Sequence, residues 1–184
     1  DRMRTAGCHR VAAVVHPDAL VHLDRAGENK WLVEADPDAT LFASLQRGLT
    51  ALDQGSLPAD RLVAGTLLLP IDCPWPGREV AIALVARALG AQLRGQAWRV
   101  VRPRLRSDRD GGDQGEDRSE EPRTGRHGHP ILLASTWTSE LTGADGTRGR
   151  LDHLIRDLVE DEALSVDLRE PAILANFNRD GVSR

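Results

Sequence analysis

The sequence predicts an α/β fold with a doubly wound, mostly parallel sheet. Unbroken apolar runs, typical of strands buried on both faces, alternate with segments whose apolar residues recur every three or four positions, as in an amphipathic helix,. Strand, helix and loop recur in that order, which is the pattern of a parallel sheet with helices on both faces. We expect the 184 residues to form a single domain over residues 1–184, because this length allows a substantial core,.

The amino-terminal part supplies the first elements of this pattern. Residues 1–7 resemble the last turns of a helix closed by Gly7, and the β-rich run 11–15 predicts a strand,. A short helix and a strand at 31–33 follow. Leucines at positions 41, 45, 49 and 52 then share one face of a predicted helix,. We therefore expect the chain to start inside a βαβ unit, and we interpret it as truncated at its amino terminus.

The rest of the chain continues the alternation, with one interruption. From residue 104 to about 124, apolar residues nearly vanish while Arg, Asp, Glu and Gly crowd together. Such a segment buries too little apolar surface to offset its ordering entropy, so we predict a disordered, solvated insertion rather than a regulatory tail. The expected elements are strands at 62–71, 98–101 and 131–133, helices at 77–93 and 151–158, and short late strands at 163–168 and 172–174,.

Composition excludes several classes of function. With 24 basic and 28 acidic residues, the net charge of −4 gives no general attraction to nucleic acid or to an anionic membrane,. No apolar stretch approaches the roughly 20 residues that cross a bilayer, and the start has no apolar core of a secretory signal. Cys8 and Cys73 have no metal-ligand spacing and are predicted to be free thiols,. We expect a cytoplasmic protein; its oligomeric state cannot be predicted.

Asp72 is the first candidate for a functional residue. The apolar run 67–71 ends abruptly in this acid, so the predicted strand delivers a carboxylate to its carboxyl end, the edge where open α/β sheets bind ligands,. A desolvated carboxylate needs a partner, commonly a helix terminus or a divalent cation beside phosphates. Taken alone, this stretch is explained about equally well if Asp72 only stabilises a turn before Pro74.

Two further polar clusters stand next to predicted strands. Gly128-His129-Pro130 precedes the strand at 131–133, and Asn176 and Asn178 follow the last strand. Together with Asp72-Cys73-Pro74, which comes first along the chain, these clusters resemble the motifs of the MobA-like nucleotidyltransferase family. Members of this family attach a nucleotide to the molybdenum cofactor or a related acceptor. The resemblance implies a Rossmann-like nucleotidyltransferase fold and covers most of the chain outside the charged insertion.

The resemblance also implies roles for individual residues. Asp72 would hold Mg²⁺ beside the α-phosphate and act as the catalytic carboxylate, with Asn178 as a second metal ligand. Ser44 would bind the nucleotide, while Gly128 and His129 would line the acceptor side. Simpler interpretations stay open: His129 could fix a turn before its proline, and Ser44 could be a packing or surface serine.

Two departures from the family pattern bear on activity. In the family, a glycine-rich loop that cradles the triphosphate precedes the first helix, and we find no counterpart of it in residues 1–184; Arg179-Asp180-Gly181 stands where the family has Thr-Pro-Glu. Backbone amides of that loop neutralise phosphate charge, so we expect this polypeptide to be inactive or impaired.

Three functions therefore remain as alternatives. The first is Mg²⁺-dependent transfer of a nucleotide from CTP or GTP to the molybdenum cofactor or another small phosphorylated acceptor. The second is a non-catalytic binding or scaffold module that keeps the fold, and the third is nucleotidyl transfer to a sugar or polyol phosphate.

Overall fold

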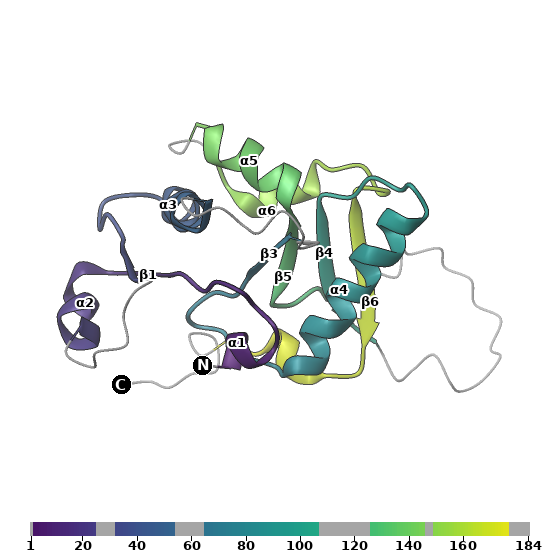
Figure 1. The fold of residues 1–184 in the computed structure, drawn as a ribbon, viewed down its shortest axis with the longest axis horizontal. Coiled ribbons are helices and arrows are strands. Elements are labelled where there is room, and N and C mark those ends of the chain that lie inside the picture. The colour runs from purple at the N-terminus through teal and green to yellow at the C-terminus, as the bar shows by residue number, and fades with distance from the viewer. Residues whose placement is uncertain (1, 25–31, 54–64, 107–125, 146–148, 177–184) are drawn as a thin grey trace, which may run out of the picture.

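The structure is a computed structural model that describes residues 2–24, 32–53, 65–106, 126–145 and 149–176. Its larger sheet has four strands in the order β3 (Gly65–Leu68), β5 (Ile131–Ala134), β4 (Val100–Leu105) and β6 (Ala163–Leu168) (Figure 1). β4 and β6 pair in parallel, while β5 is antiparallel to both β3 and β4. Three of these four strands therefore point the same way, and the predicted α/β class is confirmed.

Helices cover both faces of this sheet. α4 (Arg78–Leu93) packs on one face, where Val101 and Leu132 are buried with it. The other face buries Val100 and Leu133 beneath α3 (Leu41–Asp53), α5 (Ser135–Gly143) and α6 (Leu151–Arg156). Neighbouring residues of one strand thus enter opposite cores, because side chains alternate along a strand. This is why the strands appear as continuous apolar runs in the sequence.

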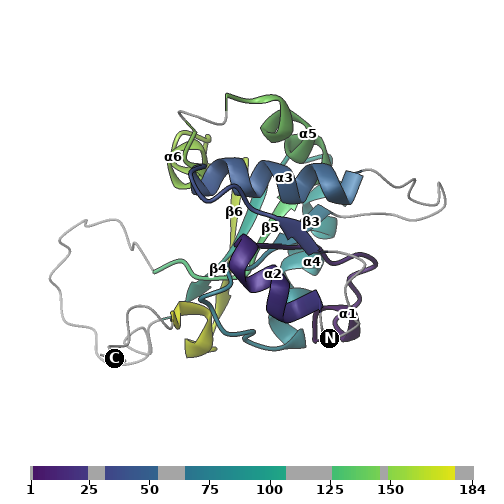
Figure 2. The ribbon, with the colours of Figure 1, turned by 90° about the vertical axis from the view of Figure 1, so that its left-hand side faces the viewer.

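The amino-terminal part forms a smaller unit beside the sheet. Its strands β1 (Ala13–Val15) and β2 (Leu32–Glu34) pair in parallel as a two-stranded sheet. The helices of this part, among the residues that the structure describes, are α1 (Arg2–Thr5), α2 (Pro17–Asp24) and α3. Figure 2 views this side directly, with α3 above α2. α3 packs against β1, β2 and α5, and so joins this unit to the core.

Most predicted elements are present, with two differences. Residues 172–174, predicted as a strand, instead belong to the 3₁₀ helix η2 (Pro171–Leu174), so that prediction was wrong. The Glu170 carboxylate accepts a hydrogen bond from the Ala172 amide, which caps the turn, and proline suits its first position,. Helix α5 was not predicted, although Trp137 and Leu141 stand at helical spacing and are both buried.

The predicted charged insertion lies mostly outside the described residues. β4 continues to Leu105, so the strand reaches into the first positions assigned to the insertion. Residues 107–125 are not described. At the base of this connection, the Leu105 amide donates a hydrogen bond of 3.1 Å to the Arg126 carbonyl. In the described part of the chain, no helix is long and apolar enough to cross a membrane.

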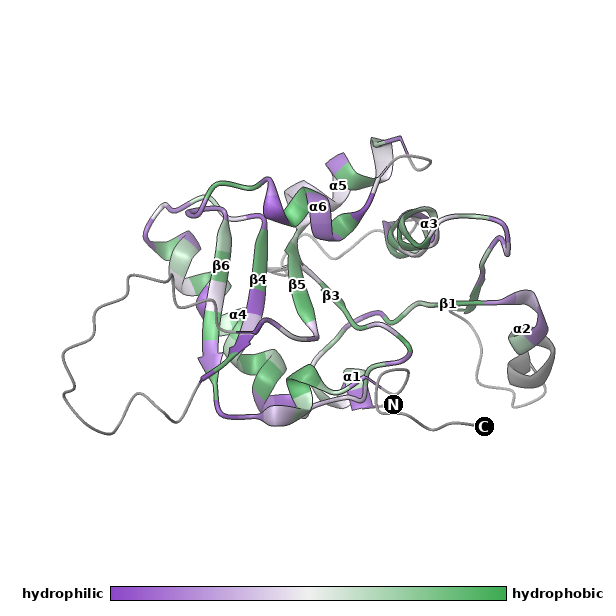
Figure 3. Ribbon diagram, turned by 180° about the vertical axis from the view of Figure 1, so that it is seen from behind, coloured by the Kyte–Doolittle hydropathy of each residue, from purple (hydrophilic) through white to green (hydrophobic). Residues whose placement is uncertain are grey.

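A polar strip runs along β4 and β6 on the face opposite α4. In the parallel register, Arg102 lies beside Ser165 and Arg104 beside Asp167. Figure 3 shows the change along both strands, from hydrophobic residues near α6 to hydrophilic residues at the other end. Arg104 donates two hydrogen bonds to the Asp167 carboxylate, from Nε to Oδ1 and from Nη2 to Oδ2, and the second of these is 2.9 Å long. His127 Nε2 lies 2.9 Å from the Ser165 hydroxyl.

The strip predicts a pH-dependent stability. Burial, and then the positive charges of Arg102 and Arg104, lower the pKa of His127 from 6.5 to about 4, with a smaller opposing effect of Asp167. The unfolded chain therefore takes up this proton near pH 6.5 and the folded chain only near pH 4, so stability falls as the pH drops through this interval. Because His127 remains partly exposed, we discount the effect to about 1–2 kcal/mol.

This dependence can be measured by urea unfolding between pH 7 and pH 4. The His127→Gln variant keeps an amide that can bond Ser165 but cannot titrate, and its stability should vary less over this interval. An equal loss of stability in both proteins would contradict the assignment to His127.

Candidate functional site

The strand directions bring the three predicted polar clusters to one edge of the sheet. Asp72 follows β3, and η2 with Asn176 follows β6, so both lie beyond carboxyl ends of strands. β5 runs the opposite way, which places its amino end, preceded by Gly128 and His129, at that same edge. We call Asp72, Gly128, His129 and Asn176 the edge cluster. Ligand sites of open α/β sheets occur at this kind of edge.

The central contact of the edge cluster joins Asp72 to Asn176. The Asn176 side-chain amide donates a hydrogen bond of 2.9 Å to Asp72 Oδ2, although 104 positions separate the two residues. The thiol of buried Cys73 lies 3.7 Å from Asp72 Oδ1 and 4.0 Å from the Asn176 amide nitrogen. The Cys73 amide bonds the Pro70 carbonyl and closes the turn that presents Asp72. The predicted proximity of Asp72 and the carboxyl-terminal asparagines thus holds for Asn176.

Backbone hydrogen bonds fix the segment that carries Gly128 and His129. The Gly128 amide donates to the Pro103 carbonyl at 3.0 Å, and the His129 amide donates to the Ile173 carbonyl at 2.8 Å. A Cβ added at Gly128 would overlap the Ile173 carbonyl oxygen and lie 2.6 Å from its carbon. The glycine therefore allows η2 to pack against this segment. The contact of Gly128 with an acceptor stays a prediction, and no pattern in the sequence indicates the role of Ile173.

His129 presents an unsatisfied nitrogen at the edge cluster. Its side chain is partly buried, and Nδ1 is shielded from solvent with no hydrogen-bond partner among the described residues. Burial lowers the pKa of His129, and the charge of Asp72 opposes this change without cancelling it. The imidazole is therefore neutral at pH 7. A buried nitrogen without a partner costs about 1–3 kcal/mol, which a bound group at this position would offset.

The other two predicted site residues lie elsewhere. Ser44 is on α3, partly buried, and its amide bonds the Thr40 carbonyl. α3 lies at the level of α5 and α6 in Figures 1 and 2, whereas η2 lies at the opposite end of the sheet. The structure therefore does not bring Ser44 into the edge cluster, and its nucleotide contact stays a prediction. Asn178 lies outside the described residues.

The edge cluster offers few ligands for a metal ion. Among the described residues, no group of three or more His, Cys, Asp and Glu side chains is placed to hold one. Asp72 contributes a carboxylate and Asn176 an amide oxygen, since an amide can turn to present either atom. Mg²⁺ is usually held by one or two carboxylates together with substrate phosphates and waters. The oxygen donors of Asp72 and Asn176 therefore fit a divalent cation that binds together with the phosphates of a substrate.

Comparisons with known proteins agree with this architecture. Rv0371c from Mycobacterium tuberculosis H37Rv has a crystal structure similar to this chain, with a TM-score of 0.53 and 19% sequence identity over 97% of this chain and 77% of that one. A second structure, of Rv0371C in complex with manganese, gives a TM-score of 0.53 and 17% identity over 97% of this chain and 78% of the other. At these identities, the similarity shows the fold.

A comparison with curated proteins gives no significant match. The model of one protein family matches residues 1–164, which contain the β3 turn with Asp72 and the Gly128-His129 segment. The chain belongs to the family of the MobA-like NTP transferase domain.

Proposed function

We propose that this protein transfers a nucleotide from CTP or GTP to the molybdenum cofactor or a related phosphorylated acceptor, with Mg²⁺ held at Asp72. Membership of a family of NTP transferase domains supports a nucleoside triphosphate as the substrate. The observation that carries the proposal is the hydrogen bond of 2.9 Å between Asn176 and Asp72, which fixes a carboxylate at the ligand-binding edge,. Cys8 and Cys73 form no disulfide within the described residues, which supports a reducing, cytoplasmic location,.

The metal part of the proposal rests on the donors at the edge cluster. Asp72 would hold the cation, and the amide oxygens of Asn176 and Asn178 would serve as further ligands,. Rv0371C, which has a similar fold, was crystallised in complex with manganese. Mn²⁺ and Mg²⁺ share a preference for oxygen ligands, so either ion suits this donor set. A bound divalent cation would neutralise charge on the phosphates during transfer.

The residues of the chain then act by positioning. The Asn176 amide holds one oxygen of Asp72, so that the carboxylate keeps its orientation when a substrate arrives,. Neutral His129 would donate a hydrogen bond to the acceptor or accept one from it. In nucleotidyl transfer an acceptor oxygen displaces pyrophosphate from the α-phosphorus, and such reactions depend mainly on alignment and on electrostatic stabilisation.

The direct test is transfer of label from α-³²P-labelled CTP or GTP. The protein, purified as the product of its complete coding sequence, is incubated with each nucleotide, Mg²⁺ or Mn²⁺, and molybdopterin, and the label in the acceptor is measured with and without EDTA. We expect metal-dependent labelling from one nucleotide in preference to the other. Labelling of a sugar or polyol phosphate alone would replace the acceptor assignment.

The same samples test the scaffold alternative. A scaffold would label no acceptor, and calorimetry with each nucleotide and Mg²⁺ would give no binding heat. Failure in both measurements would overturn the proposed function.

A further inference from the structure

The polar strip of β4 and β6 forms one side of a hollow on the sheet face opposite α4. Its volume is about 570 Å³, which is within the usual range for sites of small molecules,. Arg102, His127 and Ser165 supply the polar part of the wall. Ile155 and Leu158, from α6 and the turn after it, supply the apolar part. The hollow can therefore accommodate a ligand with one charged and one apolar end.

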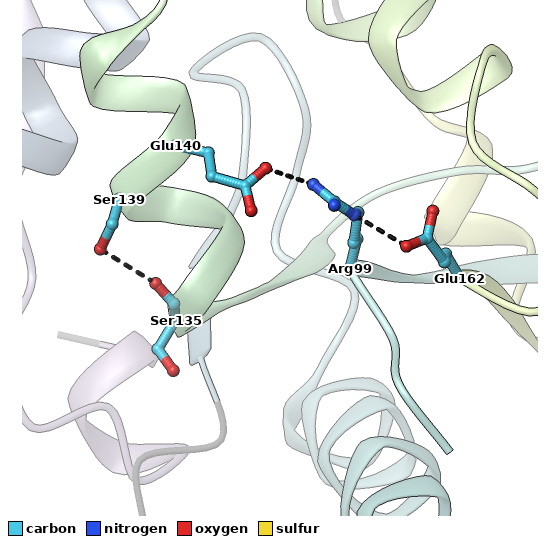
Figure 4. A network of polar contacts seen from close by, with 5 residues as sticks. All are labelled: Arg99, Ser135, Ser139, Glu140 and Glu162. Atoms are coloured by element: carbon cyan, nitrogen blue, oxygen red, sulfur yellow. Dashed lines mark hydrogen bonds and ion pairs between the residues drawn. The ribbon is translucent and has the colours of Figure 1, made fainter.

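The arginines of this region differ in how they are paired. Arg99 forms ion pairs with Glu162 and Glu140, as Figure 4 shows. Arg104 is paired with Asp167. Arg102 lies beside Ser165 in the register, where Arg104 has its aspartate, and it forms no ion pair or side-chain hydrogen bond with another described residue. Ser165 thus occupies the position beside Arg102 that corresponds to the position of Asp167 beside Arg104.

The environment of Arg102 makes an added anion favourable. Its Nε is shielded from solvent and has no hydrogen-bond partner among the described residues. Burial lowers the pKa of this guanidinium. A partly buried charge without a partner raises the free energy of the folded protein. An anion that pairs with Arg102 should therefore gain more binding free energy than an anion that pairs with an exposed arginine. The Ser165 hydroxyl and the neutral His127 ring add hydrogen-bonding groups beside it,.

We propose that this hollow binds a small carboxylate ligand with an apolar body, its carboxylate on Arg102 and its body against Ile155 and Leu158. The planar guanidinium matches a carboxylate in two-point geometry. Arg156 and Glu160, both exposed on the rim, offset each other, and Arg104 is neutralised by Asp167. One net positive charge therefore remains, which favours a monoanion over doubly charged phosphate. This inference does not depend on the proposed nucleotidyl transfer, because it uses no residue of the edge cluster.

The experiment titrates the ¹⁵N-labelled protein at pH 7 with benzoate, acetate or inorganic phosphate, and follows the Arg102 Nε–H signal by NMR. The Arg102→Gln variant identifies this signal by its loss. We expect benzoate to shift it at millimolar concentration, and to bind at least threefold more tightly than acetate, which lacks the apolar body. Tighter binding of phosphate than of benzoate would overturn the carboxylate assignment.

Two variants and one control locate the site. Arg102→Gln removes the charge, and Ser165→Asp supplies an internal carboxylate in the geometry of the Arg104 and Asp167 pair. Each should weaken benzoate binding at least tenfold, as measured from the shifts of the remaining lining residues. Arg94→Gln, an exposed arginine after α4, should leave binding unchanged. Unaltered binding in both folded lining variants, or no benzoate binding by the original protein, would overturn the proposal.

Discussion

Replacing Asp72 with asparagine is expected to lower the rate of metal-dependent nucleotidyl transfer by about three orders of magnitude. A metal ion contributes several kcal/mol of charge stabilisation in reactions of this kind, and each 1.36 kcal/mol changes the rate tenfold. Asparagine keeps the size of the side chain and one oxygen, so the Asn176 amide still has an acceptor,. The variant should therefore remain folded, with an unchanged circular dichroism spectrum and unfolding midpoint.

Measuring metal affinity distinguishes a loss of activity through the metal site from a loss through misfolding. Binding of Mn²⁺ in the presence of the nucleotide, followed by electron paramagnetic resonance, should weaken strongly in Asp72→Asn. Asn176→Ala removes only the group that orients the carboxylate, so its affinity should fall by about 10–100-fold, as for other groups that support a metal ligand. Full activity and normal metal binding in Asp72→Asn would refute the assignment of Asp72 as the metal ligand.

The second large effect concerns Gly128. Gly128→Ala should destabilise the protein by about 3 kcal/mol, because the new methyl group would overlap the carbonyl oxygen and carbon of Ile173,. These are backbone atoms, which cannot turn aside as the end of a flexible side chain could. Relief of the overlap requires η2 to move away, which would break the hydrogen bond from the His129 amide to Ile173 and shift Asn176 relative to Asp72. We therefore expect both lower stability in urea unfolding and lower transferase activity.

Gly143→Ala provides the matched control. Gly143 ends α5, and an added Cβ there meets no atom within 4 Å. Alanine is favoured over glycine in helices by up to about 1 kcal/mol, so this variant should be as stable as the original protein or slightly more so. If both alanine variants unfolded at the same urea concentration, the proposed crowding at Gly128 would be wrong.

The class of fold could be predicted from the sequence because β5 and the start of β4, in the middle of the larger sheet, are buried on both faces. Val100 and Val101, like Leu132 and Leu133, enter opposite cores, and this produces the unbroken apolar runs by which the strands were recognised,. The direction of β5 could not be predicted in this way, because an apolar run has the same composition whichever way the strand is oriented.

The roles of the candidate site residues stay predictions, and only part of their arrangement could be anticipated from the sequence. The motifs grouped Asp72 with Asn176 and Asn178, and the side chains of Asp72 and Asn176 form a hydrogen bond. The tight packing of Gly128 against Ile173 depends on backbone atoms brought together by the fold, and such contacts leave no periodic pattern. Residues 172–174 were mistaken for a strand because three apolar residues after a proline suit a short strand as well as a 3₁₀ turn,.

The antiparallel course of β5 has a consequence for how this domain tolerates changes in length. Antiparallel neighbours such as β4 and β5 need only a short link, whereas parallel neighbours need a crossover of a dozen residues or more,. Here the link is tied at its base between Leu105 and Arg126, and the cost of closing a loop rises only slowly with its length,. The connection between Leu105 and Arg126 is therefore a point where residues could be inserted or removed without rearranging the sheet.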